Sequence, residues 1–336
     1  MQVPDNPIRK AINNPKKVPK FIFDDIMLKT ISEIHSSLIS SQYPQQEDLL
    51  GKLRSEDNYC LIVLDACRFD YLQSSFHQYF QGECMPTWAA SLNTFQYLQN
   101  LWKGTYDFPY ITAAAPVTSQ KFNFQDGEKV DGLAGDGAEL SKRYNGYIPN
   151  EHFNQLVEVW REAWDEDLGV CPPEPVTERA IDIAPETDQM VVHYFQPHGP
   201  FIGSKQLTGQ IEEYDTNIKG GAVEKGIWSA AKSGDLNKSD LRKMYQANLD
   251  RVLPAVGELV QRTDFDKYIV IGDHGEALGE YNRYYHSIEH PKVRLVPWAQ
   301  IDGVQENIPE MWEYEAEAQS IDKDTVSRLQ ELGYIE

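Results

Sequence analysis

The stretch Tyr59-Cys-Leu-Ile-Val-Leu-Asp65 is a continuous apolar run that stops at an acid. Such runs are typical of strands buried on both faces of a parallel sheet. Between residues 241 and 260, apolar side chains recur every three or four positions, which predicts an amphipathic helix. Alternating strands and helices indicate an α/β fold, a three-layer sandwich around a central, mostly parallel sheet. The other predicted strands are Phe108–Ala113, Met190–Phe195 and Tyr268–Gly272.

The composition excludes several classes of protein. The 336 residues include 31 Lys and Arg against 52 Asp and Glu, a net charge of −21, which argues against general binding to nucleic acid. No apolar run approaches the roughly 18 residues of a membrane-spanning helix. The first residues contain no apolar signal segment, so we expect a cytoplasmic protein. The four cysteines form no CxxC pair, which favours neither a disulfide framework nor a cysteine zinc site.

Composition shifts along the chain suggest three parts. Residues 1–50 form a basic arm and a helix, residues 51–302 the main domain, and residues 303–336 an acidic C-terminal segment. Residues 203–240 are polar and are expected to form an excursion or lid outside the core. A short helix is expected within 321–334.

The arm before the first predicted helix is basic. Five Lys and Arg residues against one Asp fit either peripheral contact with an anionic membrane surface or glycan, or simply a solvated tail. Four prolines prevent a regular helix there. From Asp24 to Leu38, a helical face follows an acidic start; its apolar residues are Ile26, Ile31, Ile34 and Leu38.

Groups able to bind metals or anions lie at three predicted strand ends. The first strand ends at Asp65, the second carries His193, and the third ends at Asp273, which His274 follows. Sites in open α/β sheets form at the carboxyl ends of the strands. Asp65, Asp273 and His274 therefore offer two carboxylates and an imidazole to one divalent cation. Asp65 would instead cap a helix if one began at Ala66.

Other polar residues are placed to contact a substrate. His193, His198, His286 and Arg68 would neutralise the outer oxygens of a phosphate or sulfate ester. Arg68 would alternatively form a salt bridge with Asp70. The mixed nitrogen and oxygen ligands favour zinc or manganese, with magnesium or calcium as alternatives.

Several motifs resemble those of the alkaline phosphatase and sulfatase superfamily over roughly residues 55–300. Asp273-His-Gly-Glu276 resembles its metal-binding signature, and His193-Tyr-Phe-Gln-Pro-His-Gly-Pro200 its substrate-binding histidine segment. The histidine spacing is most similar to phosphoethanolamine transferases, and 65–70 resembles archaeal sulfatase-like proteins. The resemblance implies an alkaline-phosphatase-like domain with a metal at Asp65, Asp273 and His274. Because 193–200 contains no aspartate, it favours one tightly bound ion.

The superfamily places its nucleophile, which is also a metal ligand, at a helix start after the first strand. Thr94-Phe-Gln-Tyr-Leu98 resembles the threonine-led helix of archaeal sulfatase-like proteins, which makes Thr94 the first candidate. Cys84-Met-Pro-Thr-Trp88 resembles the sulfatase formylglycine motif, except that Trp88 replaces its arginine. Ser91 and Thr87 remain alternatives. A plain core helix around 88–101 is compatible with a catalytic Thr94 only if that helix begins late.

The sequence thus predicts a metal-dependent enzyme that hydrolyses small-molecule or glycan phosphate or sulfate esters through a covalent intermediate. Two alternatives stay open. One is a phosphoryl-group transferase, for example of phosphoethanolamine type, that modifies a glycan or lipid head group. The other is a non-catalytic binding module in which the metal only stabilises the fold.

Overall fold

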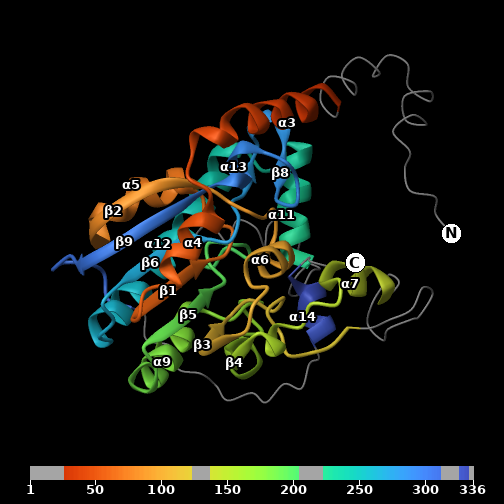
Figure 1. The fold of residues 1–336 in the computed structure, drawn as a ribbon. Helices are drawn as coiled ribbons and strands as arrows, with labels where there is room; N and C mark the ends of the chain where they lie inside the picture. Colours follow the sequence, from red (N-terminus) through yellow and green to blue (C-terminus); the bar gives the residue numbers. More distant parts are fainter. Residues whose placement is uncertain (1–25, 123–136, 204–221, 312–324, 333–336) are drawn as a thin grey trace, which may run out of the picture.

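The structure, a computed structural model, describes residues 26–122, 137–203, 222–311 and 325–332. Its centre is a seven-stranded sheet in the order β2-β9-β6-β1-β5-β3-β4 (Figure 1). Only β9 runs against the other strands, so the predicted mostly parallel sheet is confirmed. The strands are β1 (Tyr59–Leu64), β2 (Phe80–Trp88), β3 (Tyr106–Thr112), β4 (Phe153–Glu158), β5 (Gln189–Tyr194), β6 (Tyr268–Gly272) and β9 (Leu295–Val304).

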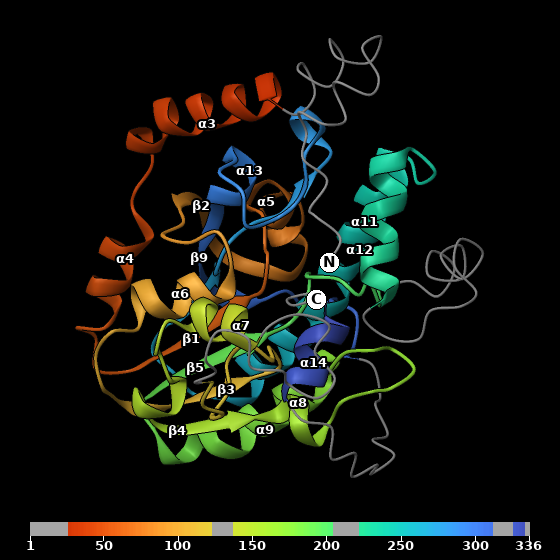
Figure 2. The ribbon, with the colours of Figure 1, turned by 90° about the vertical axis from the view of Figure 1, so that its right-hand side faces the viewer.

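Helices cover both faces of this sheet, as a three-layer sandwich requires (Figures 1 and 2). One face carries α5 (Phe69–Tyr79), α9 (Pro173–Ile183) and α12 (Lys238–Arg262); α12 contacts both α5 and α9, and all three contact strands of the sheet. The opposite face carries α4 (Gln46–Leu53) and α6 (Thr94–Leu101), with α7 (Gly137–Tyr144) beside α6. None of the described helices is long and apolar enough to cross a bilayer.

Smaller elements surround this sandwich. The helices are α3 (Leu28–Ile39), α8 (Val159–Glu162), α11 (Ala222–Ser233), α13 (Pro291–Arg294) and α14 (Thr325–Glu331). The short strands are β7 (Ala277–Leu278) and β8 (Tyr284–Tyr285), which pair with each other. The 3-10 turns are η3 (Ser40–Gln42), η4 (Pro149–Glu151), η5 (Ala184–Glu186) and η6 (Glu280–Asn282).

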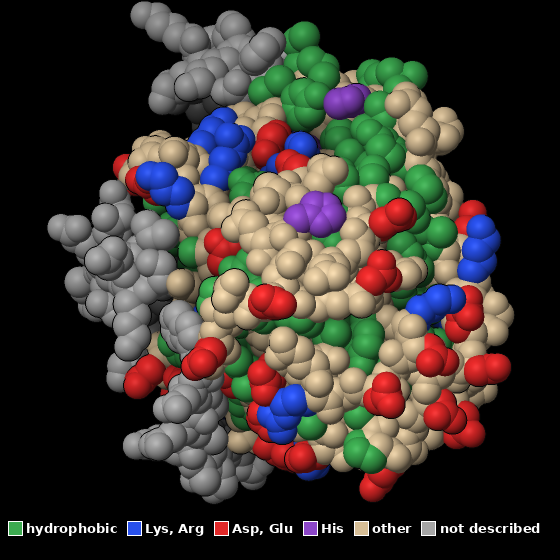
Figure 3. Space-filling view, turned by 90° about the vertical axis from the view of Figure 1, so that its left-hand side faces the viewer, with side chains coloured by type: hydrophobic (Ala, Val, Ile, Leu, Met, Phe, Trp, Pro, Cys, Tyr) green, Lys and Arg blue, Asp and Glu red, His purple; other side chains and the backbone are tan. Residues whose placement is uncertain are grey.

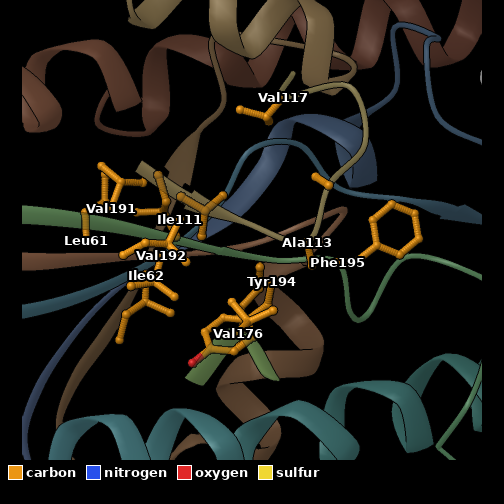
Figure 4. Close-up of a cluster of buried hydrophobic side chains, with 14 of the residues drawn as sticks. Leu61, Ile62, Ile111, Ala113, Val117, Val176, Val191, Val192, Tyr194 and Phe195 are labelled. Atoms are coloured by element: carbon orange, nitrogen blue, oxygen red, sulfur yellow. The ribbon is translucent and has the colours of Figure 1, made fainter. Parts of the chain in front are cut away.

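The core forms where the central strands meet the helices. Figure 4 shows strand side chains from both sides of the sheet, with Val176 of α9 packed against Tyr194 of β5. All six residues of β1 are buried, which explains why that stretch has no polar alternation. Leu50 of α4 joins this core, so α4 spans the predicted boundary between residues 50 and 51. Leu329 of α14 joins it too, within the expected C-terminal helix.

The structure rejects one alternative from the sequence and corrects one expectation. No helix begins at Ala66; α5 begins at Phe69, so Asp65 is not its cap. Residues 203–240 are not wholly outside a core, because α11 contributes the buried Ile227 and Trp228 to a second apolar cluster with α12. Residues 204–221 lie outside the described residues.

The interface of α9 with α12 contains one buried and one exposed ion pair. Arg251 pairs with Glu174, and both side chains are 4% exposed. Arg262 pairs with Glu178 at 2.7 Å, with both nearly half exposed. Arg251→Met leaves a buried carboxylate without its cation, so we expect it to lower the unfolding free energy by about 3–5 kcal/mol. The matched Arg262→Met should cost less than about 1 kcal/mol. Urea titrations measure both; equal losses would contradict the assigned burial.

Candidate active site

Three strands bring their carboxyl ends to one place. β1 lies between β5 and β6, and Leu64 is in register with Tyr194 on one side and Gly272 on the other. The residues that follow β1 and β6 are Asp65 and Asp273. Parallel pairing therefore puts the two carboxylates at one edge of the sheet. They lie there fully buried.

The predicted ligands converge at this edge. His274 Nε2 lies 3.5 Å from Asp65 Oδ1 and 3.4 Å from Asp273 Oδ2. Thr94 is the first residue of α6, and its hydroxyl donates to Asp273 Oδ2 at 2.9 Å and to Asp65 Oδ2 at 3.3 Å. The helix thus begins late, as a catalytic Thr94 requires. Ligand atoms around a tetrahedral zinc, each about 2.0–2.1 Å from it, are about 3.3–3.4 Å apart, close to these separations.

The orientation of the His274 ring fits a cation site here. Its Nδ1 lies 2.9 Å from the carbonyl oxygen of Gly275, which can only accept a hydrogen bond, so Nδ1 carries the proton. The Nε2 lone pair then faces the oxygens of Asp65 and Asp273. Among the described residues, this buried Nε2 has no hydrogen-bond partner. Asp65, Thr94, Asp273 and His274 thus direct three oxygen-bearing side chains and one imidazole nitrogen to a single point, a ligand set that fits a divalent metal.

Backbone groups hold Asp273 in its orientation. Asp273 Oδ1 accepts from the backbone N–H groups of Ala66 at 3.0 Å and of His274 at 2.8 Å, which leaves Oδ2 toward Thr94. Ala66 adopts a left-handed conformation, with φ of 58°. At Gly275, a Cβ would overlap the carbonyl oxygen of Lys292, so only glycine fits the Asp-His-Gly turn.

A second group of ligand-capable residues lies beside the first. His198, Glu276 and His286 offer atoms within 4.8 Å of one another, all buried. The ring centroids of His286 and His274 are 4.4 Å apart, so the two groups adjoin. The sequence favoured one ion because 193–200 contains no aspartate. The structure brings the acid from Glu276, the last residue of the Asp273-His-Gly-Glu276 motif.

The candidate substrate-contacting histidines are neutral near pH 7. Burial lowers the pKa of His193 to about 4 and that of His198 to about 3. Burial, together with His274 and His198, also holds the pKa of His286 well below its ordinary value. Neutral imidazoles coordinate ions and form hydrogen bonds, but they supply no full positive charge. The charge that would balance a phosphate or sulfate must therefore come mainly from bound cations.

Three buried residues that we did not predict orient these groups. Tyr110 of β3 places its hydroxyl 2.8 Å from His193 Nδ1. Tyr245 of α12 donates to the carbonyl of Ala66 at 2.7 Å and accepts from the N–H of Arg68 at 2.9 Å. Asn248, one turn along, donates to the carbonyl of His198 at 2.8 Å. From the sequence, Tyr245 and Asn248 can be identified only as residues on the buried face of a helix.

Arg68 makes the salt bridge that the sequence allowed. Its guanidinium is 2% exposed and contacts Asp70 at 2.7 Å and Glu280 at 2.9 Å. Burial opposes ionisation of Asp70, but its hydrogen bonds and its attraction to Arg68 and Lys292 lower its pKa to about 2. Arg68 thereby ties the start of α5 to the loop after Asp273. Its predicted contact with substrate stays a prediction.

The other candidate nucleophiles lie in different settings. Cys84 is within β2, opposite Ala299, and burial raises its pKa to about 12. Thr87 is in the same strand and donates its hydroxyl to the carbonyl of Pro44. Ser91 is buried in the turn before α6. Of these four candidates, Thr94 is the one with hydrogen bonds to both carboxylates.

Comparisons with known proteins found similarity in structure only. No family profile and no curated protein matches the sequence. The soluble domain of lipooligosaccharide phosphoethanolamine transferase A from Neisseria meningitidis is 12% identical over 72% of this chain and 75% of its own, with a TM-score of 0.41. The phosphonate monoester hydrolase of Agrobacterium radiobacter is 14% identical over 73% and 68%, with a TM-score of 0.42.

Metal binding is testable without an enzyme assay. Chelated protein titrated with zinc or manganese should be stabilised by about 2.7 kcal/mol at a hundred times Kd. Asp273→Asn should abolish most of this thermal shift, and Glu276→Gln should lower bound metal from two ions to one if the second group binds an ion. Metal analysis after desalting counts the ions. An undiminished shift in Asp273→Asn would contradict the assignment of the first group.

The Tyr245 hydroxyl should support metal binding indirectly. Tyr245→Phe leaves two buried backbone groups of the Asp65 loop without their partner, at about 1–3 kcal/mol. We expect metal affinity to fall about 10–100-fold, as when a group that orients a ligand is lost. Tyr71→Phe is the matched control, because its ring packs edge-on against Tyr245 at 4.8 Å. Calorimetric titration of metal into both variants compares their affinities. Equal affinities in the two variants would show that the Tyr245 hydroxyl does not support metal binding.

Proposed function

We propose that this protein is a metal-dependent hydrolase of phosphate or sulfate esters, with Thr94 as the nucleophile. The observation that carries this proposal is the pair of hydrogen bonds from the Thr94 hydroxyl to Asp65 and Asp273, beside the imidazole of His274. A hydroxyl next to carboxylates and a cation site is activated for attack. A bound divalent ion would lower the pKa of the hydroxyl and polarise the ester oxygens.

The reaction follows from which atoms are near each other. As Thr94 Oγ1 bonds to the phosphorus or sulfur, its proton passes to Asp273 Oδ2, which is 2.9 Å away. The bond from phosphorus or sulfur to the leaving oxygen breaks, and that oxygen takes a proton from water and departs as the alcohol. In neutral His198 and His286, Nδ1 donates toward the carbonyl oxygen of Gly199 and the carboxylate of Glu276, so their Nε2 atoms would bind a cation. His193 would donate a hydrogen bond to the outer oxygens of the ester. Water then attacks the phosphorus or sulfur, the bond to Thr94 Oγ1 breaks, and Oγ1 recovers its proton from Asp273 Oδ2, so that phosphate or sulfate is released. An acceptor hydroxyl in place of water would make the protein a transferase.

Two features bear on how the site would bind an anionic ester. Thr94, His193 and His198 are fully buried, which strengthens electrostatic interactions with a bound anion. The protein carries a net charge of −21, so an anion needs cations within the site itself. Small-molecule or glycan esters are the proposed substrates, and a cytoplasmic location remains a prediction.

The nucleophile can be identified by comparing matched variants. Thr94→Ala should lower turnover of p-nitrophenyl phosphate or p-nitrophenyl sulfate by on the order of a thousandfold or more, while Thr94→Ser retains measurable activity because it keeps a hydroxyl. Cys84→Ser, Thr87→Val and Ser91→Ala should stay within a few-fold of the wild type. Loss of activity in one of these three, with Thr94→Ala active, would reject the assignment.

Mass spectrometry separates phosphate from sulfate chemistry. Acid-quenched turnover should trap a phosphate or sulfate on the peptide containing Thr94, because the intermediate is covalent. The peptide containing Cys84 should have the mass of unmodified cysteine. Formylglycine at Cys84 would instead indicate a sulfatase with a different nucleophile. No modified peptide and no turnover in a metal-loaded protein would favour the non-catalytic binding module.

A further inference from the structure

Helix α3 buries its polar side and exposes its apolar side, the reverse of an ordinary surface helix. Its buried side chains are polar and small, namely Ser32 and Ser36. Ser32 donates its hydroxyl to the carbonyl of Glu289, and His35 Nδ1 lies 2.8 Å from the hydroxyl of Tyr281. A surface helix normally buries its apolar side against the core. In α3 the polar side faces the protein, so the apolar side is left exposed at the molecular surface.

The outward side is a continuous apolar stripe, which we call the α3 stripe. At 100° per residue, its four side chains fall within an arc of about 60°. They are Met27, Ile31, Ile34 and Leu38, exposed by 48%, 40%, 54% and 69%. Hydrophobic side chains gather at the top of the molecule in Figure 3, where α3 lies in Figure 1. Apart from the adjacent Ile26, the only other large apolar side chain this exposed among the described residues is Met85. A clustered exposed apolar surface marks an interaction site.

The charge of the sequence indicates what covers the stripe. Residues 1–20 contain five Lys and Arg and one Asp, a charge of +4, so the remaining 316 residues carry −21 − 4 = −25. Positive charge is thus concentrated in the sequence just before α3, whose exposed side is apolar. This combination fits an anionic lipid surface, which attracts basic segments and takes up apolar side chains. The acidic remainder of the chain is repelled by such a surface, so the attraction depends on the basic residues that precede the stripe in sequence and not on the net charge.

We propose that α3 docks on an anionic membrane, with the α3 stripe in the interface. Its 12 residues span about 18 Å, less than the roughly 30 Å hydrocarbon core, so α3 would lie in the plane of the surface. α3 packs on η6 and α13, which flank the segment carrying His286. Docking would hold that side of the site near the membrane. The proposal does not depend on the reaction proposed above.

Co-sedimentation with vesicles tests the proposal with the full chain and no substrate. The wild type should sediment with phosphatidylglycerol–phosphatidylcholine vesicles and at least about tenfold less with phosphatidylcholine alone. Ile34→Asn with Leu38→Asn should lower binding to the anionic vesicles by at least about tenfold. The matched control, Thr30→Asn with Ser37→Asn, changes exposed polar positions of the same helix and should bind like the wild type.

Further measurements distinguish a membrane from a second copy of the chain as the partner of the α3 stripe. Lys16→Gln, Lys17→Gln and Lys20→Gln together should weaken anionic binding while leaving the circular dichroism spectrum unchanged. Equal sedimentation of wild type and the Ile34→Asn, Leu38→Asn variant would overturn the proposal. So would a wild-type dimer in light scattering that becomes a monomer in that variant, because the stripe would then bind a second copy. Absence of wild-type binding to anionic vesicles would overturn it as well.

Discussion

The arrangement of this molecule depends on two buried carboxylates that face the same point. Asp65 and Asp273 follow adjacent parallel strands, and neither is exposed to water. Two buried negative charges repel each other strongly in a medium of low dielectric constant. A shared cation would convert this repulsion into attraction, and His274 and Thr94 complete a ligand set of the right type. The site is therefore the place where folding and chemistry are most closely coupled.

Neighbouring backbone and side-chain groups hold these carboxylates in positions that an isolated chain would not adopt. Ala66 has an unfavourable positive φ, and its N–H and carbonyl are both used, by Asp273 and by Tyr245. Gly275 permits the turn to pass against the backbone of Lys292. Strain of this kind persists only where neighbouring contacts determine the conformation. Helix α12 supplies two of these contacts, through Tyr245 and Asn248, so its long buried face serves the site as well as the core.

The sequence predicted the sheet and the first ligand group well, because both depend on local patterns. A buried parallel strand must be apolar throughout, and strand ends are visible as the acids at 65 and 273. The start of α6 at Thr94 was predictable only from resemblance, since Trp88 to Leu101 reads equally well as one helix. Glu276 lies in the Asp273-His-Gly-Glu276 motif, but its proximity to His198 could not be predicted, because only the fold brings the two residues together. Tyr110 and Tyr245 orient their neighbours through single hydroxyls, and no sequence pattern separates such a residue from a core aromatic. The exposure of the α3 stripe also could not be predicted, because periodicity identifies an apolar face of a helix without showing whether that face is buried or exposed.

The central claim is that Asp65, Thr94, Asp273 and His274 bind one divalent cation. Anomalous diffraction from crystals of the zinc- or manganese-loaded protein tests it most directly. The account predicts a strong peak in contact with these four side chains, at about 2.0–2.2 Å from their nitrogen and oxygen atoms for zinc. A fully loaded crystal with ions only at other positions, and with Asp65 and Asp273 hydrogen-bonded to each other through a proton, would contradict it.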